Sequence, residues 1–241
     1  MNRILNQFVE KQYSEFKKEV ISGWALDGGD FDKFDAELKP IFKRYLSLAC
    51  IATLVGRGKR RNEYIQSVIE ASQLSLVLAM KGYENPCCVL LRQCIELVLK
   101  HVYFSTHPVE YEWVTSHEGY RDLTFQKLLD FWVITEEYRK LDTDKYVYDT
   151  LSDWFGVLSR HVHVHSRGFM GYGQVGFRYR VKVNGIKKLN ERTREIWPLL
   201  TIILIAQFPK CYYGATPLEK RVIRNFLPVK FRERIDQYLQ N

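Results

Sequence analysis

The amino-acid sequence predicts an all-α fold with one small β-hairpin near residues 175–185. Apolar residues recur with the 3.6-residue period of helices along most of the 241 residues. A composition of 46% hydrophobic and 27% charged residues is typical of a globular chain and excludes the disordered and collagen-like classes. Strict alternation of apolar and basic residues, the pattern of a strand, is found in Phe177–Val183, and Asn184-Gly185 supplies a turn after it.

Four helices are expected before residue 105. Their expected bounds are Met1–Ser22, Phe34–Val55, Glu63–Met80 and Cys87–Phe104. The first is amphipathic and is followed by the turn residues Gly23 and Asp27-Gly28-Gly29. Asn85 is expected as the N-cap of the fourth helix, with Pro86 at its first position, because these residue types favour helix starts. The fourth helix is apolar around most of its circumference, so we expect it near the centre of the fold.

Residues 105–140 are less regular and predict short elements that pack over the core. An amphipathic helix is expected over Asp144–His161, and a long buried helix, bent at Pro198, over Leu189–Phe208. Two short basic helices close the chain, and their starts are marked by Thr216-Pro217 and by Pro228. The predicted organisation is an N-terminal amphipathic extension (1–40), a main helical domain (41–210) and C-terminal basic helices (211–241).

Cysteine content and hydropathy favour a cytoplasmic protein. The five cysteines are an odd number, and four of them lie in apolar helical patterns, as buried reduced thiols do. The first twenty residues are charged throughout, unlike a signal peptide. The longest apolar stretch, Ile196–Ala206, has about half of the ~20 residues that a membrane span needs. We therefore expect no membrane-spanning segment and no membrane partner.

The chain is basic, with 36 Lys and Arg against 28 Asp and Glu and a net charge of +8. Residues 1–40 hold six basic and eight acidic side chains, whereas residues 167–192 hold seven basic and one acidic. An excess of this size favours a polyanionic partner such as nucleic acid. The alternative is that positive charge serves solubility alone.

The segment Ser159-Arg160-His161-Val162-His163-Val164-His165 is the most unusual in the chain, because it holds three of the six histidines directly after an arginine. One interpretation is a zinc site. His161, His163 and His165 would share one face of an extended segment, and His161 and His165 would be one turn apart in a helix; the sequence offers no further ligands at a recognisable spacing. A second is a polar helix end, where protonated imidazoles gain from the helix dipole. The third is cleavage of a phosphodiester without a metal ion.

Cleavage of a phosphodiester without a metal ion needs the two residue types that the segment supplies, histidine and arginine. RNA carries its own nucleophile, the 2′-hydroxyl group, so a ribonuclease must accept one proton, donate another and stabilise a dianionic phosphorane. Histidine suits proton transfer because its ordinary pKa of about 6.5 lies near working pH. Arginine suits the phosphorane because its planar guanidinium group stays charged and binds two oxygens.

The same residues resemble a known family. Arg160-His161-Val162-His163-Val164-His165 matches the R-x4–6-H motif of the HEPN superfamily, with a polar residue just after the arginine, at the end of a long helix. The resemblance covers about residues 63–208. It implies a helical bundle that forms a homodimer with the two motifs facing each other. Many members are metal-independent ribonucleases that act as toxins or as effectors of phage defence by abortive infection, and some are inactive binding modules.

Carried over by residue, the resemblance implies that Arg160 binds the scissile phosphate and that His165 is the general acid or base. His161 takes the polar role that orients the site. His163 has no set role, which leaves the assignment between His163 and His165 open. Glu96 resembles the acidic residue that several such families place on the helix facing the motif.

Other basic and aromatic residues form candidate contacts. Arg92 and Glu96 are four residues apart and share a helix face, so they form either a support for the site or a plain surface pair. The basic strand and the residues before it provide candidate contacts to an RNA backbone and bases, namely Arg167, Arg178, Tyr179, Arg180 and Lys182. The alternative for this strand is a cationic edge that blocks aggregation.

The sequence therefore predicts a metal-independent endoribonuclease that acts on RNA, needs no cofactor and has an antitoxin or another defence protein as a possible partner. A non-catalytic module that binds RNA or a protein is the main alternative, and a zinc-dependent hydrolase is the third. Dinucleotide-binding, P-loop, kinase and Ser-His-Asp signatures are absent from the chain.

Overall fold

In the computed structural model, the described part of the chain is helical. The structure describes residues 2–24, 28–57, 63–116, 123–142, 144–162 and 183–240. Its helices are α1 (Asn2–Trp24), α2 (Gly28–Lys33), α3 (Asp35–Gly56), α4 (Glu63–Met80), α5 (Glu84–Thr106), α6 (Pro108–Ser116), α7 (Phe125–Val133), α8 (Glu136–Leu141), α9 (Tyr146–Val162), α10 (Val183–Thr193), α11 (Ile196–Gln207), α12 (Pro209–Tyr213), α13 (Pro217–Asn225) and α14 (Val229–Gln240). The described ranges contain no strand, so the all-α prediction is confirmed for them. Residues 177–182 of the expected strand lie outside these ranges.

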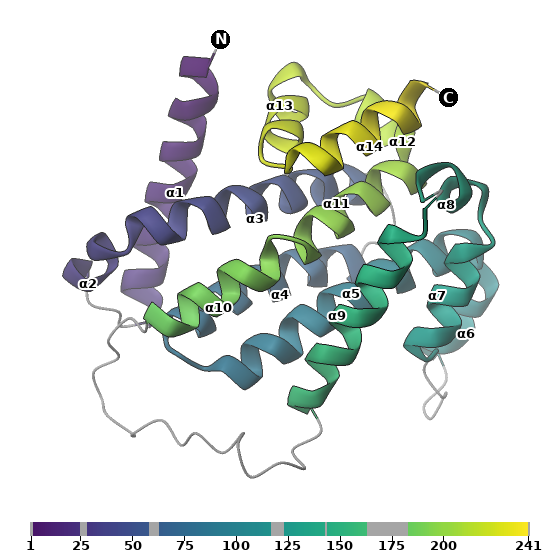
Figure 1. The fold of residues 1–241 in the computed structure, drawn as a ribbon, viewed down its shortest axis with the longest axis horizontal. Helices are drawn as coiled ribbons and strands as arrows, with labels where there is room; N and C mark the ends of the chain where they lie inside the picture. Colours follow the sequence, from purple (N-terminus) through teal and green to yellow (C-terminus); the bar gives the residue numbers. More distant parts are fainter. Residues whose placement is uncertain are drawn as a thin grey trace.

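α5 lies at the centre of the fold, as its apolar circumference predicts (Figure 1). It packs against α4, α7, α9 and α11. α11 is buried around its whole circumference because residues 196–206 are almost all apolar, and it packs against α3, α5 and α14. One hydrophobic core joins these helices to α1 and α13. The N-terminal and C-terminal segments therefore share a core with the middle of the chain, and α3 runs through residue 40 without a break.

The start of α5 differs from the expectation. The N-cap residue is Tyr83, and the helix begins at Glu84. Asn85 is therefore not the cap but lies in the first turn, with Pro86 beside it. Proline is tolerated there because a first-turn N–H group has no partner within the helix. The consequence is that the Asn85 side chain is available for a contact with another helix.

The turn expected at Asn184-Gly185 is wrong, because both residues lie in the first turn of α10. A Cβ atom on Gly185 would lie 2.2 Å from the carbonyl oxygen of Ala79 and 3.3 Å from the Cα of Gly82. The glycine therefore serves the close packing of α10 on the end of α4 rather than a hairpin turn. Similarly, Gly28-Gly29, expected as a turn, begins the short helix α2.

The long helix expected over Leu189–Phe208 is two helices, α10 and α11, which meet at Arg194 and Glu195. The break comes before Pro198 rather than at it. Proline lacks the N–H group that would bond to the Arg194 carbonyl four residues earlier, so a continuous helix would lose that bond. Beginning α11 at Ile196 places Pro198 in a first turn, where no such bond is needed. A short helix that the sequence did not predict, α12, follows α11.

Candidate functional site

α9 carries the Arg160-His161 motif at its C-terminal end. Its apolar stripe, which includes Val147, Leu151 and Leu158, is fully buried against the core. Arg160 is exposed and His161 is half-buried. The sequence prediction that the motif ends a long amphipathic helix is confirmed for these two residues.

The N-terminal end of α9 is fixed by a buried carboxylate, Asp142. Its oxygens accept hydrogen bonds from the backbone N–H groups of Val147 (2.8 Å) and Tyr148 (2.9 Å). These are first-turn donors that have no partner within the helix, so Asp142 acts as a cap. Burial raises the pKa of Asp142 above its ordinary value, and the same hydrogen bonds oppose the rise.

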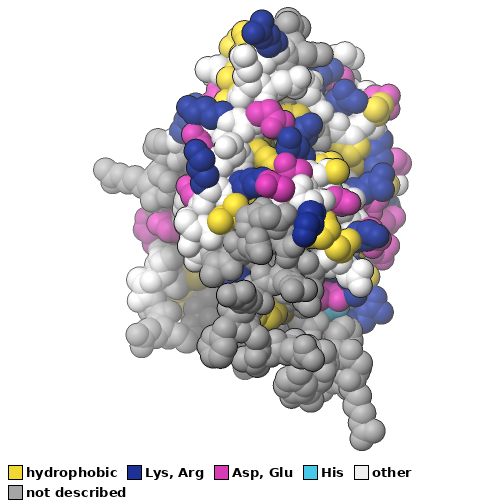
Figure 2. All heavy atoms as spheres, turned by 90° about the vertical axis from the view of Figure 1, so that its left-hand side faces the viewer, with side chains coloured by type: hydrophobic (Ala, Val, Ile, Leu, Met, Phe, Trp, Pro, Cys, Tyr) yellow, Lys and Arg dark blue, Asp and Glu magenta, His cyan; other side chains and the backbone are white. Residues whose placement is uncertain are grey.

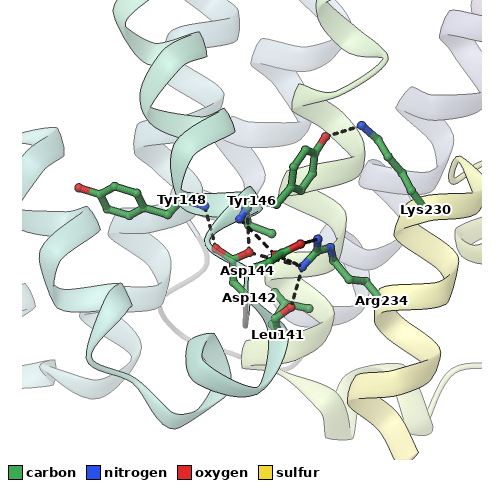
Figure 3. Close-up of polar contacts among 8 residues, drawn as sticks. Leu141, Asp142, Asp144, Tyr146, Tyr148, Lys230 and Arg234 are labelled. Carbon is green, nitrogen blue, oxygen red and sulfur yellow. Dashed lines mark hydrogen bonds and ion pairs between the residues drawn. The ribbon is translucent and has the colours of Figure 1, made fainter.

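Two cations of α14 complete this attachment (Figure 3). The Arg234 guanidinium donates to Asp144 (2.7 and 2.8 Å) and to the carbonyl oxygen of Leu141 (3.3 Å). Lys230 Nζ bonds to the Tyr146 hydroxyl and lies 3.2 Å from a carboxylate oxygen of Glu195. The C-terminal helix therefore holds the start of the helix that carries the motif.

At the other end of α9, His161 is held by α5. Its Nδ1 atom lies 3.0 Å from Oδ1 of Asn85. With Nδ1–H as the donor to this amide oxygen, the neutral imidazole carries its lone pair on Nε2. The Asn85 contact was not foreseen from the sequence, because Asn85 was expected to cap its own helix.

The surroundings of His161 are net positive. Glu84, at the start of α5, forms ion pairs with Lys188 (2.5 Å) and Arg192 (2.8 Å) of α10. One carboxylate thus faces two cations, and Arg160 adds a third. Burial and then Arg192 lower the pKa of His161 below 6.5, with smaller contributions from Lys188 and Arg160, while Glu84 opposes them. The neutral imidazole is therefore favoured at neutral pH.

The Arg92–Glu96 pair expected from the sequence is present on α5. Arg92 donates to a Glu96 carboxylate oxygen at 2.8 Å, and each side chain is about one quarter exposed (24% and 26%). The Arg92 guanidinium also lies over the ring of Phe155 of α9, 4.7 Å from its centroid. A cation held in this way over an aromatic ring joins α5 to α9. The pair therefore supports the packing of the motif helix.

A groove of about 690 Å³ lies over this pair, between α5, α9 and the start of α7. Phe125 of α7 is stacked on Phe155 in it, with ring centroids 3.6 Å apart. Ser152 and Gly156 line its α9 side. Arg160 follows Gly156 by four residues and so lies on the same helix face, one turn further on. The exposed arginine of the motif therefore lies one turn beyond the residues that line the groove.

The remaining predicted site residues lie outside the described residues. They are His163, His165, Arg167, Arg178, Tyr179, Arg180 and Lys182. The structure thus places Arg160 and His161 at the end of α9, where His161 contacts the start of α5, and separately pairs Arg92 with Glu96 further along α5.

The His, Cys, Asp and Glu side chains of the described ranges offer no metal centre. No group of three or more His, Cys, Asp or Glu side chains there is placed to hold a metal ion. All five cysteines lie in described helices as free thiols. Figure 2 shows the side of the molecule at the left of Figure 1, where basic and acidic side chains are intermixed over the described residues. That part of the surface is not a patch of a single charge.

Comparisons of the chain with models of protein families, with curated proteins and with solved structures give no match. The resemblance to the HEPN superfamily therefore rests on the Arg160-to-His165 motif and its place at the end of a helix. Among the helices that the structure describes, none is both long enough and apolar enough to cross a membrane.

Proposed function

We propose that this protein is a metal-independent endoribonuclease of the HEPN type. The observation that carries the proposal is the end of α9, where exposed Arg160 and half-buried His161 lie in net positive surroundings. Arg160 lies one helical turn beyond Gly156, which lines the α5–α9 groove. An exposed guanidinium group that makes no ion pair with another described residue suits an anionic ligand such as phosphate.

In the proposed reaction, the 2′-oxygen of RNA attacks the adjacent phosphorus atom. A base takes the 2′-hydroxyl proton, the new O2′–P bond forms, and the P–O5′ bond breaks as an acid protonates the leaving 5′-oxygen. Arg160 stabilises the charge of the phosphorane, and His165 supplies general acid or base catalysis. The products are a 2′,3′-cyclic phosphate and a 5′-hydroxyl end.

The other motif residues position these groups. His161, fixed by Asn85, orients the end of α9, and the Arg92–Glu96 pair fixes α9 on α5. Arg167, Arg178, Arg180 and Lys182 contact the RNA backbone, and Tyr179 stacks on a base. By resemblance to the family, the enzyme is a homodimer and serves as a toxin or defence effector restrained by a partner protein.

The test is cleavage of a mixed panel of RNAs by the purified protein in excess EDTA. Wild-type protein should cleave, whereas Arg160→Ala and His165→Ala should each lower the rate by about a hundredfold or more. Arg139→Ala is the matched control, because Arg139 is an exposed arginine on α8. Products should carry cyclic phosphate ends, detected by mass spectrometry.

Three results would overturn the proposal. They are a requirement for added metal, 5′-phosphate products, or cleavage that survives both motif substitutions. RNA binding without cleavage, measured on the same panel, would instead support the non-catalytic module. Growth on expression gives a second readout: the wild-type protein should impair growth, and Arg160→Ala should relieve the effect.

A further inference from the structure

A second cavity, of about 580 Å³, lies between α1, α3, α4 and α13. α13 covers part of α3, where the Ser47 hydroxyl donates to the carbonyl oxygen of Ile223 at 2.8 Å. α1 crosses another part of α3 through the ring contact of Phe16 with Phe42, with centroids 5.0 Å apart. The two covering helices leave a strip of α3 between them, and this strip lines the cavity with Leu46, Ala49, Cys50 and Thr53.

The lining of the cavity is apolar around the strip of α3. Phe8 of α1, Ile69 of α4 and Leu218 of α13 are half-buried around the strip of α3. Burial raises the pKa of the Cys50 thiol to about 12, so this group is neutral at physiological pH. Concave apolar sites of roughly 300–1,000 Å³ are typical of small-molecule binding sites.

The charged groups of the cavity are acidic, although the whole chain has a net charge of +8. The lining includes Glu15, Glu19 and Glu219, against a single cation, Arg57. Arg57 pairs with Glu219 at 2.6 Å, and Glu15 lies 3.9 Å from Lys11 in an exposed pair within α1. Glu19 and the weakly paired Glu15 therefore give the cavity its net negative charge. They are four residues apart and so lie on one helix face. The charge of Glu19 reaches the cavity wall, where it adds to the burial that raises the pKa of Tyr45 to about 12.

Position and chemistry separate this cavity from the proposed ribonuclease site. None of its lining residues belongs to α5, α9 or α10, which form the surroundings of Arg160 and His161. A phosphate-bearing ligand would meet the carboxylates of Glu15 and Glu19 here, and the exposed Lys11 offsets only the charge of Glu15. An apolar ligand with an anionic group is disfavoured for the same reason.

We propose that this cavity binds a small amphiphilic cation, in which a protonated amine is joined to an aromatic or branched apolar body. The apolar body packs against Phe8, Leu218 and the strip of α3, and the amine lies near Glu15 and Glu19, which are exposed. The bound ligand contacts α1 and α13 together. This site is independent of the ribonuclease proposal.

A matched pair of fluorescent probes tests the site. Dansylcadaverine carries an amine on an alkyl chain, whereas dansyl-6-aminohexanoic acid carries a carboxylate on a chain of similar length. Dansyl emission rises and shifts to the blue when the ring enters an apolar site. Titration of the full-length protein should give saturable binding of the amine probe, with an affinity about tenfold or more above that of the carboxylate probe.

Two variants locate the binding, and a third is the control. Ala49→Leu adds three carbons in the cavity and should abolish binding, and its helix propensity is close to that of alanine. The double variant Glu15→Gln, Glu19→Gln keeps the shape and should remove the preference for the amine probe. Glu191→Gln, on α10 and exposed, lowers the acidic charge away from the cavity and should leave binding unchanged. Far-ultraviolet circular dichroism confirms that each variant is folded.

Several outcomes would overturn the proposal. Absence of saturable binding of the amine probe, or equal affinity for both probes, would show that the cavity has no preference for cations. Unchanged binding in folded Ala49→Leu protein would place the dansyl group elsewhere on the molecule. These binding results do not depend on RNA cleavage, so either proposal can be refuted without affecting the other.

Discussion

Replacing either of two helical glycines, Gly156 and Gly185, with alanine should change the free energy of unfolding, but in opposite directions. Gly156 lies on the exposed face of α9, and an added Cβ would meet no atom within 4 Å. Alanine in a helix interior is favoured over glycine by about 1 kcal/mol because glycine loses more backbone entropy on folding. Gly156→Ala should therefore stabilise the protein by about 0.5–1 kcal/mol.

At Gly185, the Cβ atom of alanine would clash with backbone atoms, and a change of side-chain rotamer cannot relieve a clash with the backbone. The added Cβ would lie 2.2 Å from the Ala79 carbonyl oxygen and 3.2 Å from its carbon. Relief requires α10 to move away from α4 by about 1 Å, and overpacking of this kind costs roughly 1–3 kcal/mol. This exceeds the gain in helix propensity, so we expect a net loss of about 1–2 kcal/mol.

Urea unfolding followed by circular dichroism measures both changes. The two variants should differ by about 1.5–3 kcal/mol, and thermal midpoints should shift by about 2–4 °C per kcal/mol in a chain of this length. Equal stabilisation by both substitutions would refute the close approach of α10 to α4. Asn184→Ala provides the check on secondary structure. It should be neutral or slightly stabilising in an exposed helical turn, and a loss of about 1 kcal/mol would favour the hairpin instead.

Three further predictions concern local electrostatics and capping. His161 should titrate below pH 6.5 in proton NMR, and Lys188→Met should raise its pKa, because that change removes a cation and releases the charge of Glu84. The hydrogen bonds from Arg234 lower the pKa of Asp144 to about 2 from 3.8. The stabilisation is therefore present above about pH 3.8 and is lost as the pH falls through the folded-state pKa of about 2. The stability difference between wild type and Arg234→Met should shrink as the pH falls from about 4 to about 2 in urea titrations. Thr216→Ala removes the capping box of α13 and should cost about 1 kcal/mol in the same assay.

Local signals predicted most of the helices. The bounds of Glu63–Met80 agree with α4, because a continuous apolar period is sufficient to define that helix. The Thr216-Pro217 start is confirmed by a capping box at α13. At Asn184-Gly185 the prediction was wrong because packing between distant segments overrode turn chemistry. Asn184-Gly185 is a strong hairpin signal in isolation, but the absence of a Cβ at Gly185 serves the contact with Ala79, more than one hundred residues earlier.

The candidate site was predictable in part for a similar reason. Arg160 and His161 were found because they are adjacent in sequence and end a periodic helix. Asn85 was missed because Asn before Pro is typical of a helix start, and the sequence does not show that α9 ends beside it. Lys188 and Arg192 are four residues apart, which would have indicated a basic helical face if the segment had been interpreted as a helix from Val183.

The C-terminal helix shows why the limits of a motif do not define the limits of a site. The resemblance ends near residue 208, but Arg234 contacts the segment that begins α9, about 90 residues earlier in the chain. α9 has 17 residues and so spans roughly 25 Å. A helix of this length that is capped by Asp142 at one end and joined to Asn85 at the other has little freedom to shift along its axis. The position of Arg160 is therefore set by both attachments, and α14 belongs to the support of the site although it lies outside the motif.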